Sequence, residues 1–154
     1  MINKILVPVD GSETSLQAAE TAIGIAKQNQ AKVTLLSVVV QHTSNTLFGG
    51  VVPRAQAVLE TQDALKKLME SDRKGYTKIL DKLVQKFEEN QIPVEKVIRE
   101  GVASEEILAQ SEEGKYDLIV IGNRGLSKTE KFFLGSVSER IVRRAKCSVL
   151  VVKQ

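Results

Sequence analysis

The chain has little of what disulfide-bonded, secreted or membrane-spanning proteins need. Its 154 residues include one cysteine, Cys147, so no internal disulfide framework can form and a reducing cytoplasm is the expected compartment. No apolar run approaches the roughly 20 residues of a membrane span. The sequence opens directly into the strand-like segment 2–9, without the basic and apolar regions of a signal peptide. We therefore expect neither a membrane anchor nor a secretory leader.

Aromatic residues and excess charge are also scarce. Aromatic residues make up 4% of the chain, and the net charge is only +3. A nucleic-acid-binding surface is expected to show a basic stripe, often with interleaved aromatic residues, and none is present. One basic cluster closes a predicted helix, where the helix dipole favours cations. It consists of Arg140, Arg143, Arg144 and Lys146. We predict no nucleic-acid partner.

Several catalytic motifs are missing. The chain has no Gly-Lys-[Ser/Thr], so Lys128 is not a P-loop lysine. The first turn, residues 9–12, lacks the Gly-x-Gly-x-x-Gly of dinucleotide binders and the Ser-Gly-Gly-x-Asp-Ser pattern of ATP pyrophosphatases. His42 and Cys147 have no partners that would complete a triad or a metal site. No base for activating water is evident. We predict a protein that is not an enzyme, with no catalytic residues and no protein-built metal site.

Strand and helix patterns alternate along the chain. Charged residues (27%) and hydrophobic residues (42%) suit one soluble globular domain over 1–154. Apolar runs predict buried strands over 5–9, 33–40, 94–99, 117–121 and 148–152. Helical spacing predicts helices over 12–29, 57–90, 104–113 and 136–145. A mobile loop is expected over 41–53. The second helix would be about 50 Å long, so we expect a bend or break at Gly75 or before Leu65.

This order of elements predicts the fold class. Five buried strands alternating with four helices indicate an α/β domain with an open parallel sheet and helices on both faces. Ligands of such sheets bind beyond the carboxyl ends of the strands, where the strand order reverses. If the first and fourth strands are neighbours there, Asp10 and Gly122 face each other across one crevice.

A glycine motif follows the fourth predicted strand. Gly122-Asn123-Arg124-Gly125 is followed, after nine residues, by Gly135-Ser136 at the start of a helix. Glycines let the backbone approach a ligand closely, and the amides and dipole of a helix N-terminus favour an anion. The segment therefore predicts a phosphate-binding site. Alternatively, Ser136-x-x-Glu139 is a capping box, which needs no ligand but also has no use for a glycine at 135.

The spacing Gly-x2-Gly-x9-Gly-Ser, with a strand before and a helix after, resembles the nucleotide-binding motif of the universal stress protein family. The resemblance extends over the whole chain, because residues 5–12, 35–38, 117–125 and 148–153 look like that family's first, second, fourth and last strand regions. It implies the strand order 3-2-1-4-5, as in Rossmann-like adenine nucleotide alpha hydrolase folds. It also implies binding of ATP or another adenine nucleotide, with a divalent cation such as Mg²⁺ held by the phosphates, and dimerisation.

The resemblance also assigns roles to individual residues. Asp10 would accept hydrogen bonds from the ribose hydroxyls, or else merely cap the following helix. Pro8 and Val38 would flank the adenine, with the backbone of Val38 toward the base edge, although both also suit ordinary strands. Val9 is also assigned to the nucleotide site. The phosphates would lie against the motif and the start of the last helix. These residues are Gly122, Asn123, Arg124, Gly125, Gly135, Ser136, Val137 and Ser138.

Arg124 and the last strand leave further alternatives. The Arg124 side chain either pairs with a phosphate or is simply solvated, and Lys128 and Lys131 would steer an anion without fixed contacts. Residues 149–152 are wholly apolar on an expected edge strand, which invites pairing with another chain. We therefore predict a homodimer formed through Ser148 to Val152. The predicted function is a cytoplasmic, dimeric, ATP-binding stress-response protein; the alternatives are a slow ATPase and an interaction module whose glycines serve only the turn.

Overall fold

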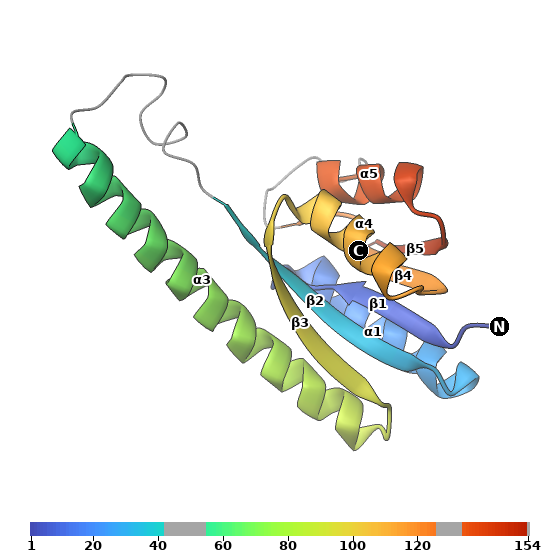
Figure 1. Cartoon of the computed structure of the whole chain (residues 1–154). Coiled ribbons are helices and arrows are strands. Elements are labelled where there is room, and N and C mark those ends of the chain that lie inside the picture. Colours follow the sequence, from blue (N-terminus) through green and yellow to red (C-terminus); the bar gives the residue numbers. More distant parts are fainter. Residues whose placement is uncertain (42–54, 126–133, 154) are drawn as a thin grey trace.

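The computed structural model describes residues 1–41, 55–125 and 134–153. His42, the predicted loop beyond Gln41, Lys128 and Lys131 lie outside the described residues. The strands and helices alternate as predicted (Figure 1). In chain order they are β1 (Lys4–Pro8), α1 (Glu13–Asn29), β2 (Lys32–Val40), α3 (Ala55–Glu89), β3 (Val94–Gly101), α4 (Ala103–Glu113), β4 (Leu118–Gly122), α5 (Ser136–Arg144) and β5 (Ser148–Val152).

The strands form one parallel sheet in the order β3-β2-β1-β4-β5, which confirms the predicted fold class. The β1 strand lies between β2 and β4, so the strand order reverses beside it. In register, Pro8 of β1 lies opposite Leu36 of β2, while Leu6 lies opposite Ile119 of β4. The carboxyl ends of β1 and β4 therefore meet at the same edge of the sheet, as is required if Asp10 and Gly122 are to face each other.

Two hydrophobic clusters pack on opposite faces of the sheet. Ile5 and Val7 point toward α1 and α3, whereas Leu6 between them points toward α4 and α5. The β4 strand alternates in the same way. Because both faces are covered, the central residues of these strands are apolar and buried, which is why the sequence shows continuous apolar runs rather than alternation.

The α1 helix begins where its sequence predicts. Ser12 adopts an extended conformation, and its hydroxyl accepts a hydrogen bond from the amide of Ser15 at 3.3 Å, as an N-cap does. Gly11 precedes it with φ of +82°, a conformation that side chains disfavour. The helix ends at Asn29, and Gln30 closes it in the left-handed region.

The α3 helix runs without interruption for 35 residues, so the expected break at Gly75 or before Leu65 is wrong. A glycine within a helix costs only about 1 kcal/mol, too little to end a helix of this length. Leu80, Leu83 and Phe87 are buried against the sheet. The amino-terminal half extends well past the sheet (Figure 1), which accounts for a length that a small domain does not need.

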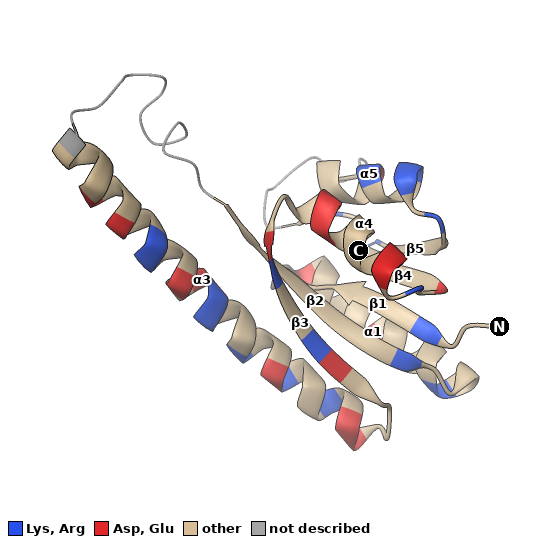
Figure 2. Cartoon of the chain, in the orientation of Figure 1, with Lys and Arg blue, Asp and Glu red and all other residues tan. Residues whose placement is uncertain are grey.

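In Figure 2 basic positions of α5 lie beside acidic positions of α4. Arg144 contacts Glu105 of α4 at 2.8 Å, and Lys146 contacts Glu112 at 2.9 Å. Arg140 and Arg143 also have carboxylate partners. The pairs made by Arg140, Arg144 and Lys146 join α5 and the segment after it to α4, whereas that of Arg143 lies within α5. Among the described residues, no helix has both the length and the apolarity needed to cross a bilayer.

Candidate functional site

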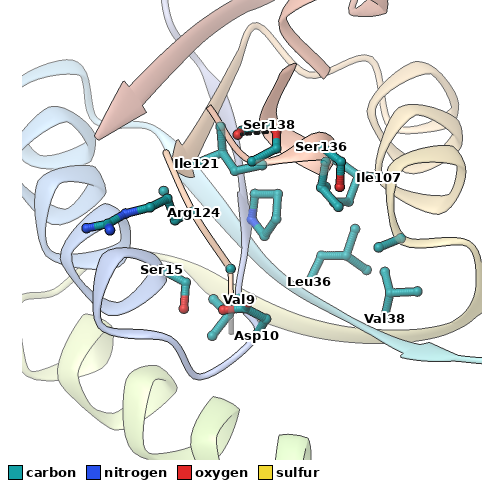
Figure 3. Close-up of a pocket in the computed structure, with 16 residues that line it drawn as sticks. Val9, Asp10, Ser15, Leu36, Val38, Ile107, Ile121, Arg124, Ser136 and Ser138 are labelled. Atoms are coloured by element: carbon teal, nitrogen blue, oxygen red, sulfur yellow. Dashed lines mark hydrogen bonds between the residues drawn. The ribbon is translucent and has the colours of Figure 1, made fainter. Parts of the chain in front are cut away.

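A pocket opens at the sheet edge where β1 and β4 end. Its empty volume is about 660 Å³, including the part open to solvent. All the residues predicted for a ligand line it except Asn123. They are Pro8, Val9, Asp10, Val38, Gly122, Arg124, Gly125, Gly135, Ser136, Val137 and Ser138. The structure therefore brings together residues from opposite ends of the chain (Figure 3).

Asp10 has one oxygen engaged by the protein. Its Oδ1 accepts from the amide of Ser12 at 2.9 Å and from the Ser12 hydroxyl at 2.5 Å. Its Oδ2 faces Gly125, where a Cβ atom would lie only 2.7 Å away. Capping and ligand binding are therefore not exclusive for this residue: Oδ1 holds the turn, and Oδ2 faces the glycine loop and the pocket.

The three glycines of the motif differ in what surrounds them. A Cβ at Gly122 would lie 2.7 Å from Thr14 Oγ1 and 2.8 Å from the Thr14 carbonyl carbon, so this glycine lets α1 pack directly on β4. At Gly135 a Cβ would meet nothing closer than 3.4 Å, an ordinary contact. The φ of Gly135 is −65°, which any residue adopts. The fold therefore requires a glycine at 122 and does not require one at 135.

The start of α5 forms the wall opposite Asp10. Gly135 is the N-cap residue and Ser136 the first helical residue, and no side chain caps the helix. The capping box, which was the alternative explanation for Ser136, does not form, since Ser136 lies inside the helix. Ser138 is buried, and its hydroxyl donates to the carbonyls of Asn123 and Gly135, each at 2.9 Å. The first-turn amides of α5 remain at the pocket, as an anion site requires.

The side chains of Arg124 and Asn123 lie away from the centre of the pocket. In Figure 3 the guanidinium of Arg124 points away from Ser136 and Asp10, toward α1. Asn123 is 3% exposed and its Oδ1 has no hydrogen-bond partner among the described residues. Its main chain is fully used: the amide donates to Val152, and the carbonyl accepts from Gly135.

Sequence reasoning missed most of the apolar wall. Beside Val38 it is formed by Leu36, Ile121 and two residues of α4, Ala103 and Ile107. The signal was the strand order itself, because β3 ends at the same edge as β2 and α4 must therefore begin beside the pocket. The wall gives the site an apolar end next to its polar, glycine-rich end.

One ionisable group of α3 lies close to the site. Burial raises the pKa of the Tyr76 hydroxyl, and the carboxylates of Asp10 and Asp72 raise it further. One turn further on, Ile79 lies against Gly11. The α3 helix therefore packs over the turn that carries Asp10. The described residues contain no cluster of three His, Cys, Asp or Glu side chains that would hold a metal ion.

These features define a class: an open parallel α/β domain with a ligand pocket at its strand-order reversal, lined by a carboxylate, a glycine loop and a helix N-terminus. Comparison with known proteins identifies the family. The model of the universal stress protein family matches residues 1–153, so the chain belongs to this family. Universal stress protein YxiE of Bacillus subtilis is 34% identical, over 99% of this chain and 100% of its own length.

Solved structures agree with the fold. The universal stress protein UspA from Lactobacillus plantarum superimposes with a TM-score of 0.84 at 23% identity, covering 99% of this chain and 98% of that one. A universal stress protein in complex with cAMP gives a TM-score of 0.69 at 26% identity, with 98% and 97% covered. The predicted family and strand order are therefore confirmed.

Proposed function

We propose that this protein binds an adenine nucleotide, with ATP the first candidate, in the pocket between β1 and β4. One observation carries the proposal. A single pocket combines an apolar slot, which is the space beside the apolar wall, with a carboxylate and with a helix N-terminus preceded by a glycine that the fold does not need. The slot suits a base, the Asp10 Oδ2 suits a ribose diol, and the amides suit phosphates. The cAMP complex of a relative with this fold adds support.

The polar end fits phosphates without a metal site built by the protein. Any Mg²⁺ would be held by the phosphate oxygens, and it would neutralise part of their charge. Gly125 and Gly135 leave the backbone accessible there, and Ser136 lies exposed at the first position of α5. Gly135 supplies the sharpest test, because its conformation is one that aspartate favours at a helix N-cap.

The experiment measures ATP and adenosine affinities by calorimetry, with Mg²⁺, for the wild type, Gly135→Asp and Gly24→Asp. The carboxylate introduced by Gly135→Asp would cap the helix but place a negative charge beside the phosphates, so ATP affinity should fall more than about ten-fold while adenosine affinity changes little. Gly24 is exposed on α1 with open space around it, and its variant is the matched control. Absence of any adenine-nucleotide binding by the wild type would overturn the proposal.

We propose binding without efficient turnover, so that nucleotide occupancy regulates partner recognition rather than feeding a reaction. Asp10 is the sole carboxylate among the described pocket residues, and its Oδ1 is tied to Ser12. In the proposed binding mode its Oδ2 holds the ribose, which leaves no carboxylate among these residues to activate water at the phosphates. ATP incubated with the protein should release phosphate no faster than in buffer. Release that scales with protein concentration and disappears in Gly135→Asp would instead establish the slow ATPase.

We further propose a cytoplasmic homodimer formed through β5. The strand pairs only with β4 among the described strands, so its other edge is open to a second chain. Leu150 at the centre of this strand is 37% exposed. An exposed apolar edge strand of this kind invites pairing with another chain. Leu150→Lys should convert a dimer into a monomer in sedimentation at micromolar concentration. A wild-type monomer under these conditions would refute this interface.

We also propose that the protein has no nucleic-acid partner. The basic cluster at and after the end of α5 supports this expectation, because each of its four side chains forms an ion pair with a carboxylate of the protein.

A further inference from the structure

Thr14, in the first turn of α1, contacts the glycine loop that follows β4, residues 123–125. The side chain is 4% exposed, and its hydroxyl donates to the carbonyl oxygen of Arg124 at 2.5 Å. The Ser12 hydroxyl reaches the same carbonyl at 3.5 Å, a much longer contact. Thr14 and Arg124 are 110 positions apart in sequence. The hydroxyl of Thr14 is therefore the main donor that holds this carbonyl.

The preceding carbonyl is held in a similar way from the other side. The Asn123 oxygen accepts from the Gly135 amide at 2.7 Å and from the Ser138 hydroxyl at 2.9 Å. Two successive carbonyls of the loop are thus fixed by donors from α1 and from the start of α5. A loop with both carbonyls held in this way has little freedom to rotate its peptide units.

Because the peptide bond is planar, fixing a carbonyl also fixes the direction of the amide N–H that follows it. In a trans peptide the C=O of one residue and the N–H of the next point in opposite directions. The described residues contain no cis peptide bond. Because Thr14 holds the Arg124 carbonyl, the Gly125 N–H is directed away from α1. Gly125 lines the pocket, and no hydrogen bond from its amide to another described residue is present.

We propose that Thr14 is a positioning residue of the nucleotide site: its hydroxyl fixes the peptide between Arg124 and Gly125, so that the Gly125 N–H is presented to the ligand's phosphates. This role rests on the proposed nucleotide binding. It concerns the phosphate end alone, because the apolar slot is built from β2, β4 and α4. Thr14 also packs against Gly122, through its Oγ1, its Cβ and its backbone carbonyl carbon.

Two variants separate the hydroxyl from the shape. Thr14→Val keeps the volume and removes the donor, whereas Thr14→Ser keeps the donor and removes a methyl group. Calorimetry with ATP and adenosine should show ATP affinity about five-fold weaker in Thr14→Val and close to wild type in Thr14→Ser. Adenosine affinity should stay within about two-fold in both variants. Equal losses for ATP and adenosine, or a loss in Thr14→Ser as large as in Thr14→Val, would overturn the positioning role.

A second readout does not require nucleotide. In the ¹⁵N relaxation of the free protein, the Gly125 amide should become more mobile in Thr14→Val and remain as in wild type in Thr14→Ser. An unchanged Gly125 amide in Thr14→Val would refute the positioning role even if the wild type binds ATP. Conversely, the wild type could bind no nucleotide while Thr14→Val still made the Gly125 amide more mobile. That result would refute the proposed function but would establish that the Thr14 hydrogen bond controls the loop.

Discussion

Adding one methyl group at Gly122 tests whether this glycine serves the fold. A Cβ there would lie 2.7 Å from Thr14 Oγ1 and 2.8 Å from the Thr14 carbonyl carbon. The second atom belongs to the backbone of a helix packed on the sheet, so the contact cannot be relieved by turning a side chain. Overpacking of this kind costs about 1–3 kcal/mol. In a chain of this size that corresponds to a fall in melting temperature of about 2–12 °C.

The matched variant is Gly135→Ser. Its Cβ would meet only ordinary contacts, and serine is at least as good as glycine at a helix N-cap. Thermal unfolding followed by circular dichroism, without nucleotide, should therefore show Gly122→Ala clearly destabilised and Gly135→Ser within about 1 °C of the wild type. A Gly122→Ala protein as stable as the wild type would refute the assignment of Gly122 to helix packing. A strongly destabilised Gly135→Ser would show that the fold needs the second glycine as well.

Two further predictions concern stability. Gly75→Ala should raise the free energy of unfolding by about 0.5–1 kcal/mol, because Gly75 lies inside the continuous α3 helix with open space where the Cβ would be; urea denaturation measures this, and a loss of stability would indicate a hinge. Backbone hydrogen bonds from Asn3 and Lys4 lower the pKa of Asp117. A carboxylate with a lowered pKa stabilises the fold above the ordinary value of about 3.9 and loses this contribution as the pH falls through its folded value. Asp117→Ala should therefore be less stable than wild type at pH 7, with the difference in urea midpoint shrinking below about pH 4; a difference independent of pH would contradict the reasoning.

The arrangement of the sheet could be predicted because each strand carries its own signal. The apolar run of β1 reflects burial on both faces, and the last strand begins and ends where its sequence suggests, at Ser148 and Val152. The α3 helix was predicted less well. Its sequence gives the helical spacing, but the decision between a bend and a straight overhang depends on a glycine penalty of about 1 kcal/mol, which the rest of the helix outweighs.

The site could be predicted where a motif and a strand end coincide, as at Asp10 and Gly125. It could not where the partner is distant in sequence. The contact of Thr14 with Gly122 and Arg124 joins segments far apart in the chain, and no local pattern announces it. Ile107 is a second example. Its place in the helical spacing predicts that it is buried, but not that it lines the pocket.

The pocket walls come from the two ends of the polypeptide, since Asp10 follows the first strand and Gly135 precedes the last helix. An occupant that touches both would link two segments that are far apart in the sequence. It would add its binding free energy to the closed form alone. Proteolysis in either segment should then slow when the site is filled, so that a filled site would lengthen the life of each molecule.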